Sequence, residues 1–432
     1  MGPIIIFDKS VLQSLNPDEA MWLDNFYLSN ITPLFFIETL ADLEKQIGHG
    51  RTPEDVVGNL AYKTPDMSSK PNAHHTTLLE GELLGAGTLD MKYGRPHISG
   101  GRILELDGKT GVIFEPSPEE EALSRWQKHE FLDLERLRAK AWRRGLSNIN
   151  LKENYAFFQK FFPIGKPKTF GDIKKLVDFH INGSDQECAL RFGLSLIGLS
   201  PQAQEKVLTR WKSCEKPPIR NFAPYFTHVF SVDFFFYTAI SADLIRHDRP
   251  SHKIDLAYLY YLPFCMVFTS NDKLHADIVP FFLRENQSYV SGAELKADLS
   301  KLDAYYDTFP DEVKKRGVMS FAFYPPDDKS FLITKLWDKH MNPKWREHEV
   351  EPRPQPETEA SKKLTERMRR LKGEGTPVPD KQYIGAREAD EMIIERKVLA
   401  RKGKWTRFPP EVINRRKNEK GEWEDIKPDE VN

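Results

Sequence analysis

The sequence predicts an α/β protein built on a parallel sheet. Residues 3–7 (PIIIF) form a continuous apolar run of mostly β-branched side chains that is too short for a helix, which is typical of a strand buried on both faces. A second run with the same character, FCMVFTS, occupies residues 264–270. Segments with helical periodicity and clear N-terminal caps lie between the two runs.

Helix and turn signals follow in order along the chain. Pro33 suits the first turn of a helix that ends at Gly48. Asp107-Gly108, between two alternating runs, predicts a β-hairpin, and residues 63–76 read as a loop. Further helices are predicted from Thr52-Pro53, from residue 117 to 145, from Ser200 to 213, over the very apolar segment 228–245, and from the capping box Ser291–Glu294.

Composition limits the class of protein. The 432 residues are 39% hydrophobic and 29% charged with a net charge of -1, which suits a globular protein and predicts no partner from bulk charge. The three cysteines lie far apart, without the spacing of a zinc site or a disulfide framework. We find neither a signal peptide nor a run long enough to span a membrane, so we expect a cytoplasmic protein.

Both predicted strands end on an aspartate, Asp8 and Asp272. The carboxyl ends of adjacent parallel strands share one crevice, so these carboxylates are expected to face each other. Carboxylates held together repel unless a cation neutralises them, and oxygen-only ligands favour Mg²⁺ or Mn²⁺. Each aspartate also fits a helix N-cap, and this structural alternative stays open.

The order of acids along the chain resembles that of the PIN-domain nucleases. In that family an Asp ends the first strand, a Glu lies on a following helix, an Asp starts a later helix and another Asp ends the next strand. Asp8 in IIIFDKS, Glu38 in PLFFIETLADL, Asp255 in HKIDLAYLYYLPF and Asp272 in MVFTSNDKLH match these positions. The resemblance implies that these four residues are catalytic and hold Mg²⁺ or Mn²⁺. Asp42, one turn after Glu38, is a candidate for an extra ligand.

The resemblance also implies an architecture. We expect a PIN-like three-layer core with a central parallel sheet, formed by residues 1–48 and 225–345. Residues 49–224 are then a large, mainly helical insertion with a hairpin, because a compact member of the family would have only a few short helices there. Residues 346–432 are rich in charge and proline and predict a charged, partly disordered tail.

The predicted function is metal-dependent hydrolysis of phosphodiester bonds, with single-stranded RNA as the substrate that the resemblance implies. Candidate substrate-binding residues close to the acids in sequence are Ser10, Arg246, Arg249, Lys253, Ser270 and His275. KWTRF, at residues 404–408, is a candidate contact to nucleic acid or to a partner protein. The alternative is a PIN-like module that binds nucleic acid or a protein through the insertion or the tail without cutting.

Overall fold

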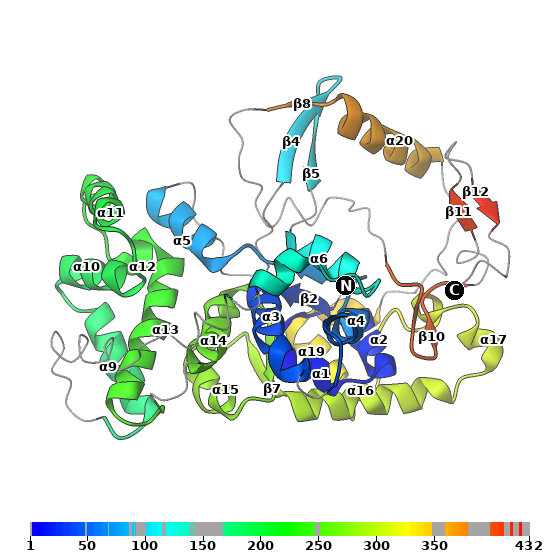
Figure 1. Ribbon diagram of the computed structural model, residues 1–432, viewed down its shortest axis with the longest axis horizontal. Coiled ribbons are helices and arrows are strands. Elements are labelled where there is room, and N and C mark those ends of the chain that lie inside the picture. Colours follow the sequence, from blue (N-terminus) through cyan, green and yellow to red (C-terminus); the bar gives the residue numbers. More distant parts are fainter. Residues whose placement is uncertain are drawn as a thin grey trace.

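The computed structural model describes most of the chain. The described residues are 2–47, 50–67, 69–85, 89, 91, 101–114, 118–138, 141, 167–246, 251–347, 359–378, 398–409, 415–417 and 423–425. They form an α/β structure with a central parallel sheet, many helices and small antiparallel sheets (Figure 1). Among them, no helix has the length and apolar character needed to cross a membrane.

The central sheet has five strands in the order β3-β2-β1-β6-β7, and every pairing is parallel. The strands are β1 (Ile4–Phe7), β2 (Leu28–Ile31), β3 (Ser69–Pro71), β6 (Val267–Ser270) and β7 (Ser288–Ser291). The two strands predicted from the sequence, β1 and β6, are direct neighbours, with Ile5 opposite Val267 and Phe7 opposite Thr269. The predicted α/β class with a parallel sheet is confirmed.

Alternate residues of β1 point into two separate hydrophobic cores. Ile5 and Phe7 belong to one core, and Ile4 and Ile6 belong to the other. Successive side chains of a strand point to opposite faces, so the sheet is covered by helices on both sides. This explains the unbroken apolar run at the start of the chain and gives the protein three layers.

The first core is built from the helices that follow the early strands and from helices near residue 300. These are α1 (Lys9–Ser14), α2 (Pro17–Phe26), α3 (Pro33–Ile47), α4 (Pro53–Lys63), α6 (Pro118–Trp126), α16 (Gly292–Asp307) and α19 (Leu332–His340). The predicted N-caps Thr52 of α4 and Ser291 of α16 are confirmed.

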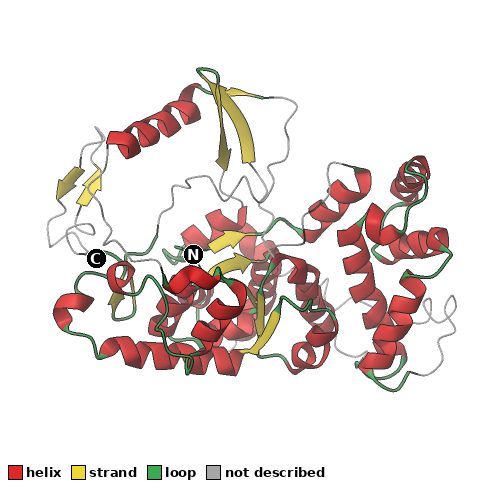
Figure 2. Cartoon of the chain, turned by 180° about the vertical axis from the view of Figure 1, so that it is seen from behind, coloured by secondary structure: helices red, strands yellow, loops and turns green. Residues whose placement is uncertain are grey.

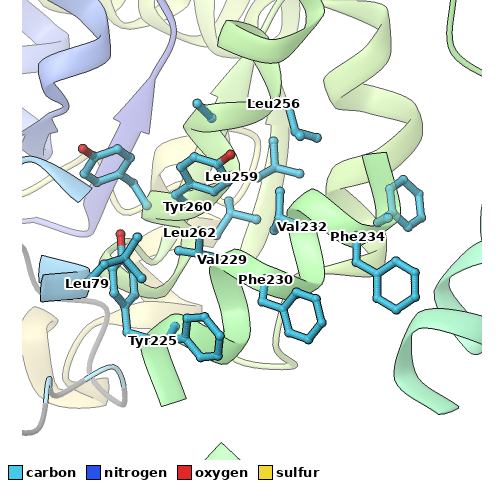
Figure 3. Close-up of a cluster of buried hydrophobic side chains, with 14 of the residues drawn as sticks. Leu79, Tyr225, Val229, Phe230, Val232, Phe234, Leu256, Leu259, Tyr260 and Leu262 are labelled. Carbon is cyan, nitrogen blue, oxygen red and sulfur yellow. The ribbon is translucent and has the colours of Figure 1, made fainter. Parts of the chain in front are cut away.

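The second core surrounds α13 (Pro224–Ser241), which is buried almost all round, as its apolar sequence predicts. Val229 and Phe230 of α13 pack near Leu259 and Leu262 of the following 3₁₀ helix η1 (Tyr258–Phe264) (Figure 3). The other members of this layer are α5 (His75–Leu84), α9 (Phe170–Ile181), α10 (Gln186–Leu196), α11 (Pro201–Ser213), α12 (Ile219–Phe222), α14 (Ser251–Ala257), α15 (Lys273–Ile278) and η2 (Val279–Phe281). Both views show α9 to α13 grouped at one end of the molecule (Figure 2).

The predicted hairpin is present as β4 (Gly101–Leu106) and β5 (Lys109–Phe114), with Asp107-Gly108 at its turn. A strand from the C-terminal region, β8 (Thr376–Pro377), adds to β4, and α20 (Glu359–Glu374) packs on this small sheet. The remaining elements are short: α17 (Asp311–Lys314), α18 (Val318–Phe321), η3 (Pro343–Arg346), β9 (Arg401–Lys402), β10 (Trp405–Thr406), β11 (Arg415–Lys417) and β12 (Trp423–Asp425).

Two local predictions were wrong. The range 63–76 is not all loop, because Ser69–Pro71 pairs with β2 as the edge strand of the central sheet. The sheet therefore takes in residues that the sequence assigned to the insertion. The single helix expected from 117 to 145 is interrupted: α6 ends at Trp126, and His129 has a φ of 57°. Leu134 and Leu137, which lie beyond this interruption, are 53% and 64% exposed.

Candidate functional site

Asp8 lies where β1 ends and α1 begins, and its carboxylate has two roles. Oδ1 caps α1 by accepting hydrogen bonds from the Val11 N–H (2.9 Å) and the Ser10 hydroxyl (2.7 Å). Oδ2 accepts a hydrogen bond from the hydroxyl of Ser270, the last residue of β6. The N-cap alternative for Asp8 therefore describes one oxygen, while the other faces the neighbouring strand.

Ser270 connects Asp8 to His275 on α15. The Ser270 hydroxyl oxygen accepts from the Asp272 N–H (2.9 Å) and lies 2.7 Å from Nδ1 of His275. Nε2 of His275 lies 2.6 Å from the backbone carbonyl oxygen of Asp255, which only accepts. With the Ser270 proton directed to Asp8, both ring nitrogens of His275 face acceptor oxygens, an arrangement that favours the imidazolium form.

The electrostatics of this pair agree with its hydrogen bonds. Burial disfavours the charged form of His275, but the hydrogen bond and the charge of Asp8 outweigh burial and raise the pKa of the imidazole. Burial likewise disfavours the Asp8 carboxylate, but His275 and the hydroxyls of Ser270 and Ser10 lower its pKa below the usual value. Nδ1 of His275 and Oδ2 of Asp8 are 3.7 Å apart. Asp8 is thus an ionised carboxylate at a buried position.

Glu38 projects from α3 toward Asp8. Its Oε2 accepts a hydrogen bond from the Tyr258 hydroxyl (2.8 Å), and its Oε1 lies 3.4 Å from the Lys9 ammonium. Burial is the largest effect on the Glu38 carboxyl and raises its pKa. Lys9 and Tyr258 act against this shift, and the charges of Asp8 and Asp255 add to it.

The other two predicted acids come from α14 and from the start of α15. Asp272 caps α15, with Oδ1 accepting from the Leu274 N–H at 2.6 Å. Asp255 lies inside α14, which begins at residue 251, so it does not cap this helix. Its Oδ2 is 3.6 Å from Nδ1 of His252.

These four acids line one pocket of about 180 Å³. The pocket lies at the carboxyl ends of β1 and β6, where the chain turns from one half of the sheet to the other. Ligands of open α/β sheets bind in the crevice at such a switch point. The lining side chains are Asp8, Ser10, Glu38, Asp255, Tyr258, Asn271, Asp272 and His275.

Other predicted residues lie elsewhere. Lys253 forms an ion pair with Asp233 and contacts the Tyr260 hydroxyl (3.1 Å). Its ammonium therefore binds these residues and does not line the pocket. Arg246 is exposed after α13, and Arg249 lies outside the described residues. Ser270 contacts Asp8 but is not a lining residue. Asp42, the candidate extra ligand, instead pairs with Lys9.

Sequence reasoning missed Lys9, Tyr258 and Asn271. Asn271 could have been predicted, because it lies between Ser270 and Asp272 at the end of a predicted strand. Tyr258 is one of several aromatic residues in an apolar run, and nothing in the sequence singles it out.

The kinds of side chain that line the pocket indicate which metal ion it could bind. Carboxylate, amide and hydroxyl oxygens are the ligands that Mg²⁺ and Mn²⁺ prefer, and the chemistry of the lining residues fits such an ion. In the described part of the chain, however, no three His, Cys, Asp or Glu side chains stand in an arrangement ready to hold a metal. The site thus has suitable donors around one cavity without a preformed cage.

Comparison with protein-family models, with curated proteins and with solved structures finds no match to this chain.

Proposed function

We propose that this chain is a metal-dependent nuclease with a PIN-like core that hydrolyses phosphodiester bonds. The observation that carries the proposal is the pocket at the switch point of the sheet, lined by Asp8, Glu38, Asp255 and Asp272. Among the described residues, Lys9, His275 and His252 are the basic side chains that pair with these four carboxylates, so acids outnumber bases in the pocket. A divalent cation would neutralise this excess.

The residues of the chain have distinct parts in this proposal. Asp8, Asp255 and Asp272 would hold Mg²⁺ or Mn²⁺, and an ion held there supplies a water of lowered pKa and stabilises charge on the leaving oxygen. Ser270 and His275 fix the orientation of the Asp8 carboxylate. Tyr258 and Lys9 do the same for Glu38. RNA is the substrate that the family resemblance favours.

Replacement of single acids by amides tests the proposal. In Asp8→Asn and Asp272→Asn, we expect Mn²⁺-dependent cleavage of a labelled single-stranded RNA to fall more than about 100-fold, because even outer-shell partners of metals matter by 10–100-fold. Asn is as good an N-cap as Asp, so α1 and α15 should persist, which circular dichroism checks.

Asp277→Asn is the matched control. Asp277 lies on the same short helix as Asp272, but it is exposed and does not line the pocket. We expect this variant to cut RNA like the unmodified protein. Equal cleavage by Asp8→Asn and Asp277→Asn would contradict the proposal, and single-stranded DNA of the same sequence tests the substrate class.

A second candidate is a PIN-like module that binds nucleic acid or protein without cutting. Two observations favour it: the described carboxylates form no ready metal cage, and the Lys9 ammonium already pairs with Glu38. This candidate predicts RNA binding that is unchanged by EDTA, together with no cleavage in Mn²⁺. A gel-shift assay with and without EDTA, run beside the cleavage assay, separates the two candidates.

A further inference from the structure

Lys9 is a buried lysine whose ammonium points at acids. Its side chain is 4% exposed, although lysine ordinarily keeps its charge in water. The ammonium lies 3.4 Å from Oε1 of Glu38, donates to the Glu38 backbone carbonyl (3.3 Å) and contacts the carboxylate of Asp42. Glu38 and Asp42 are one turn apart on α3, so a single lysine serves both acids.

Glu38 separates this lysine from the cavity. Glu38 is a lining residue of the pocket, whereas Lys9 and Asp42 are not. One oxygen of Glu38 faces the ammonium and the other accepts from the Tyr258 hydroxyl. A buried lysine therefore compensates the charge of Glu38 within the protein, whereas Asp255 lies beside the His252 imidazole (3.6 Å) and Asp272 accepts a backbone N–H.

We infer that Lys9 is an internal cation standing where a second metal ion would otherwise be needed, so that the pocket binds one divalent cation. The inference rests on the proposed function, because it assumes that the pocket binds metal at all. Two-metal phosphodiester hydrolases hold their ions about 3.5–4 Å apart between shared carboxylates. A second divalent ion beside Glu38 would lie close to a buried ammonium, where water and salt screen the repulsion poorly.

The number of bound ions tests the inference without an activity measurement. Isothermal titration calorimetry of the full chain with MnCl₂ is expected to give one site per molecule. Lys9→Met keeps the length of the side chain but removes the charge, so the Glu38 carboxylate loses its ammonium partner. We expect this variant to bind two Mn²⁺ ions.

Two control variants separate charge from burial. Lys9→Arg keeps the charge and should still bind one ion. Lys253→Met removes another inward-facing lysine, which pairs with Asp233 away from the pocket, and should also leave one site. Circular dichroism shows whether each variant folds.

The number of Mn²⁺ ions bound by each protein can contradict the inference. Two ions on the unmodified protein would overturn the inference even if Lys9→Met does not fold, and so would one ion on a folded Lys9→Met. In either case the proposed function still stands if RNA cleavage requires Mn²⁺. No binding by any of these proteins would overturn the inference and the metal-dependent function together.

Discussion

The protein contains two groups of buried acids that differ in how their charge is balanced. In one, Asp24 (0% exposed) and Asp66 are met by Lys402 (0%) and Arg407 (1%). Lys402 also donates to the carbonyl of Thr64. In the other, the pocket at the ends of β1 and β6, four carboxylates lie beside one lysine, Lys9, and two imidazoles, His275 and His252, among the described residues.

The balanced acids, Asp24 and Asp66, stabilise the fold, whereas the acids of the pocket are available to bind a ligand. Two acids and two cations cancel in the first group, so it needs nothing from outside and fastens the C-terminal strands β9 and β10 to α2. Trp405 of β10 packs edge-on against Trp22, with ring centroids 4.8 Å apart. Trp405 and Arg407, which the sequence offered for a partner or nucleic acid, are buried in the protein itself.

The largest effect is expected where the balanced group is broken. Arg407→Met removes the hydrogen bonds of the guanidinium to Asp24 and Asp66 and leaves excess negative charge at a buried site. We expect the free energy of unfolding to fall by about 3–5 kcal/mol in urea titrations.

Lys404→Met is the control on the same hairpin. Lys404 is 41% exposed and pairs with Asp303 and Asp307, so its loss should cost no more than about 1 kcal/mol. Similar losses for the two variants would show that the buried group does not fasten the hairpin.

Replacing one acid in each group compares directly how much each group contributes to stability. Asp24→Asn leaves two buried cations short of a partner, and we again expect a loss of about 3 kcal/mol or more. Asp272→Asn keeps the N-cap and removes one charge from an acidic pocket, so in EDTA its stability should stay within about 1 kcal/mol of the unmodified protein. Urea unfolding in EDTA measures both free energies, and equal losses would show that the two groups of acids do not differ in how their charge is balanced.

Local signals in the sequence were enough to predict the ends of the strands and several caps. Asp8 and Asp272 were found because an apolar run stops at each of them, and the pocket residue Glu38 was found from its order after Asp8. The edge strand β3 was missed because its sequence, Ser-Lys-Pro, has neither an apolar run nor alternation, and proline is tolerated only at such an edge.

Long-range pairings could not be predicted. Lys402 forms an ion pair with Asp24, 378 residues away in the sequence, and Lys9 forms one with Asp42, 33 residues away. No local sequence pattern predicts either partner. Whether a charged residue belongs to a solvated tail or a buried pair depends on these contacts. The sequence therefore predicted the acids of the pocket better than the cations that balance them.

The smallest effect concerns the pH dependence that a buried acid of the pocket, Glu38, gives to stability. The pKa of Glu38 is raised in the folded protein above its ordinary value of 4.5, mainly by burial. Above pH 4.5 the unfolded chain loses this proton while the folded chain keeps it, so stability falls as pH rises through the raised pKa. The slope from one group is at most about 1.4 kcal/mol per pH unit.

Glu38→Gln should remove this part of the slope in metal-free urea titrations from pH 4.5 upward. Glu82, whose pKa burial raises to about 7, adds the same slope to both proteins and cancels in the comparison. Asp8 acts in the opposite sense, because its lowered pKa affects stability only below its ordinary value of 3.8. An unchanged slope in Glu38→Gln would mean that Lys9 and Tyr258 fully offset the effect of burial on the pKa of Glu38.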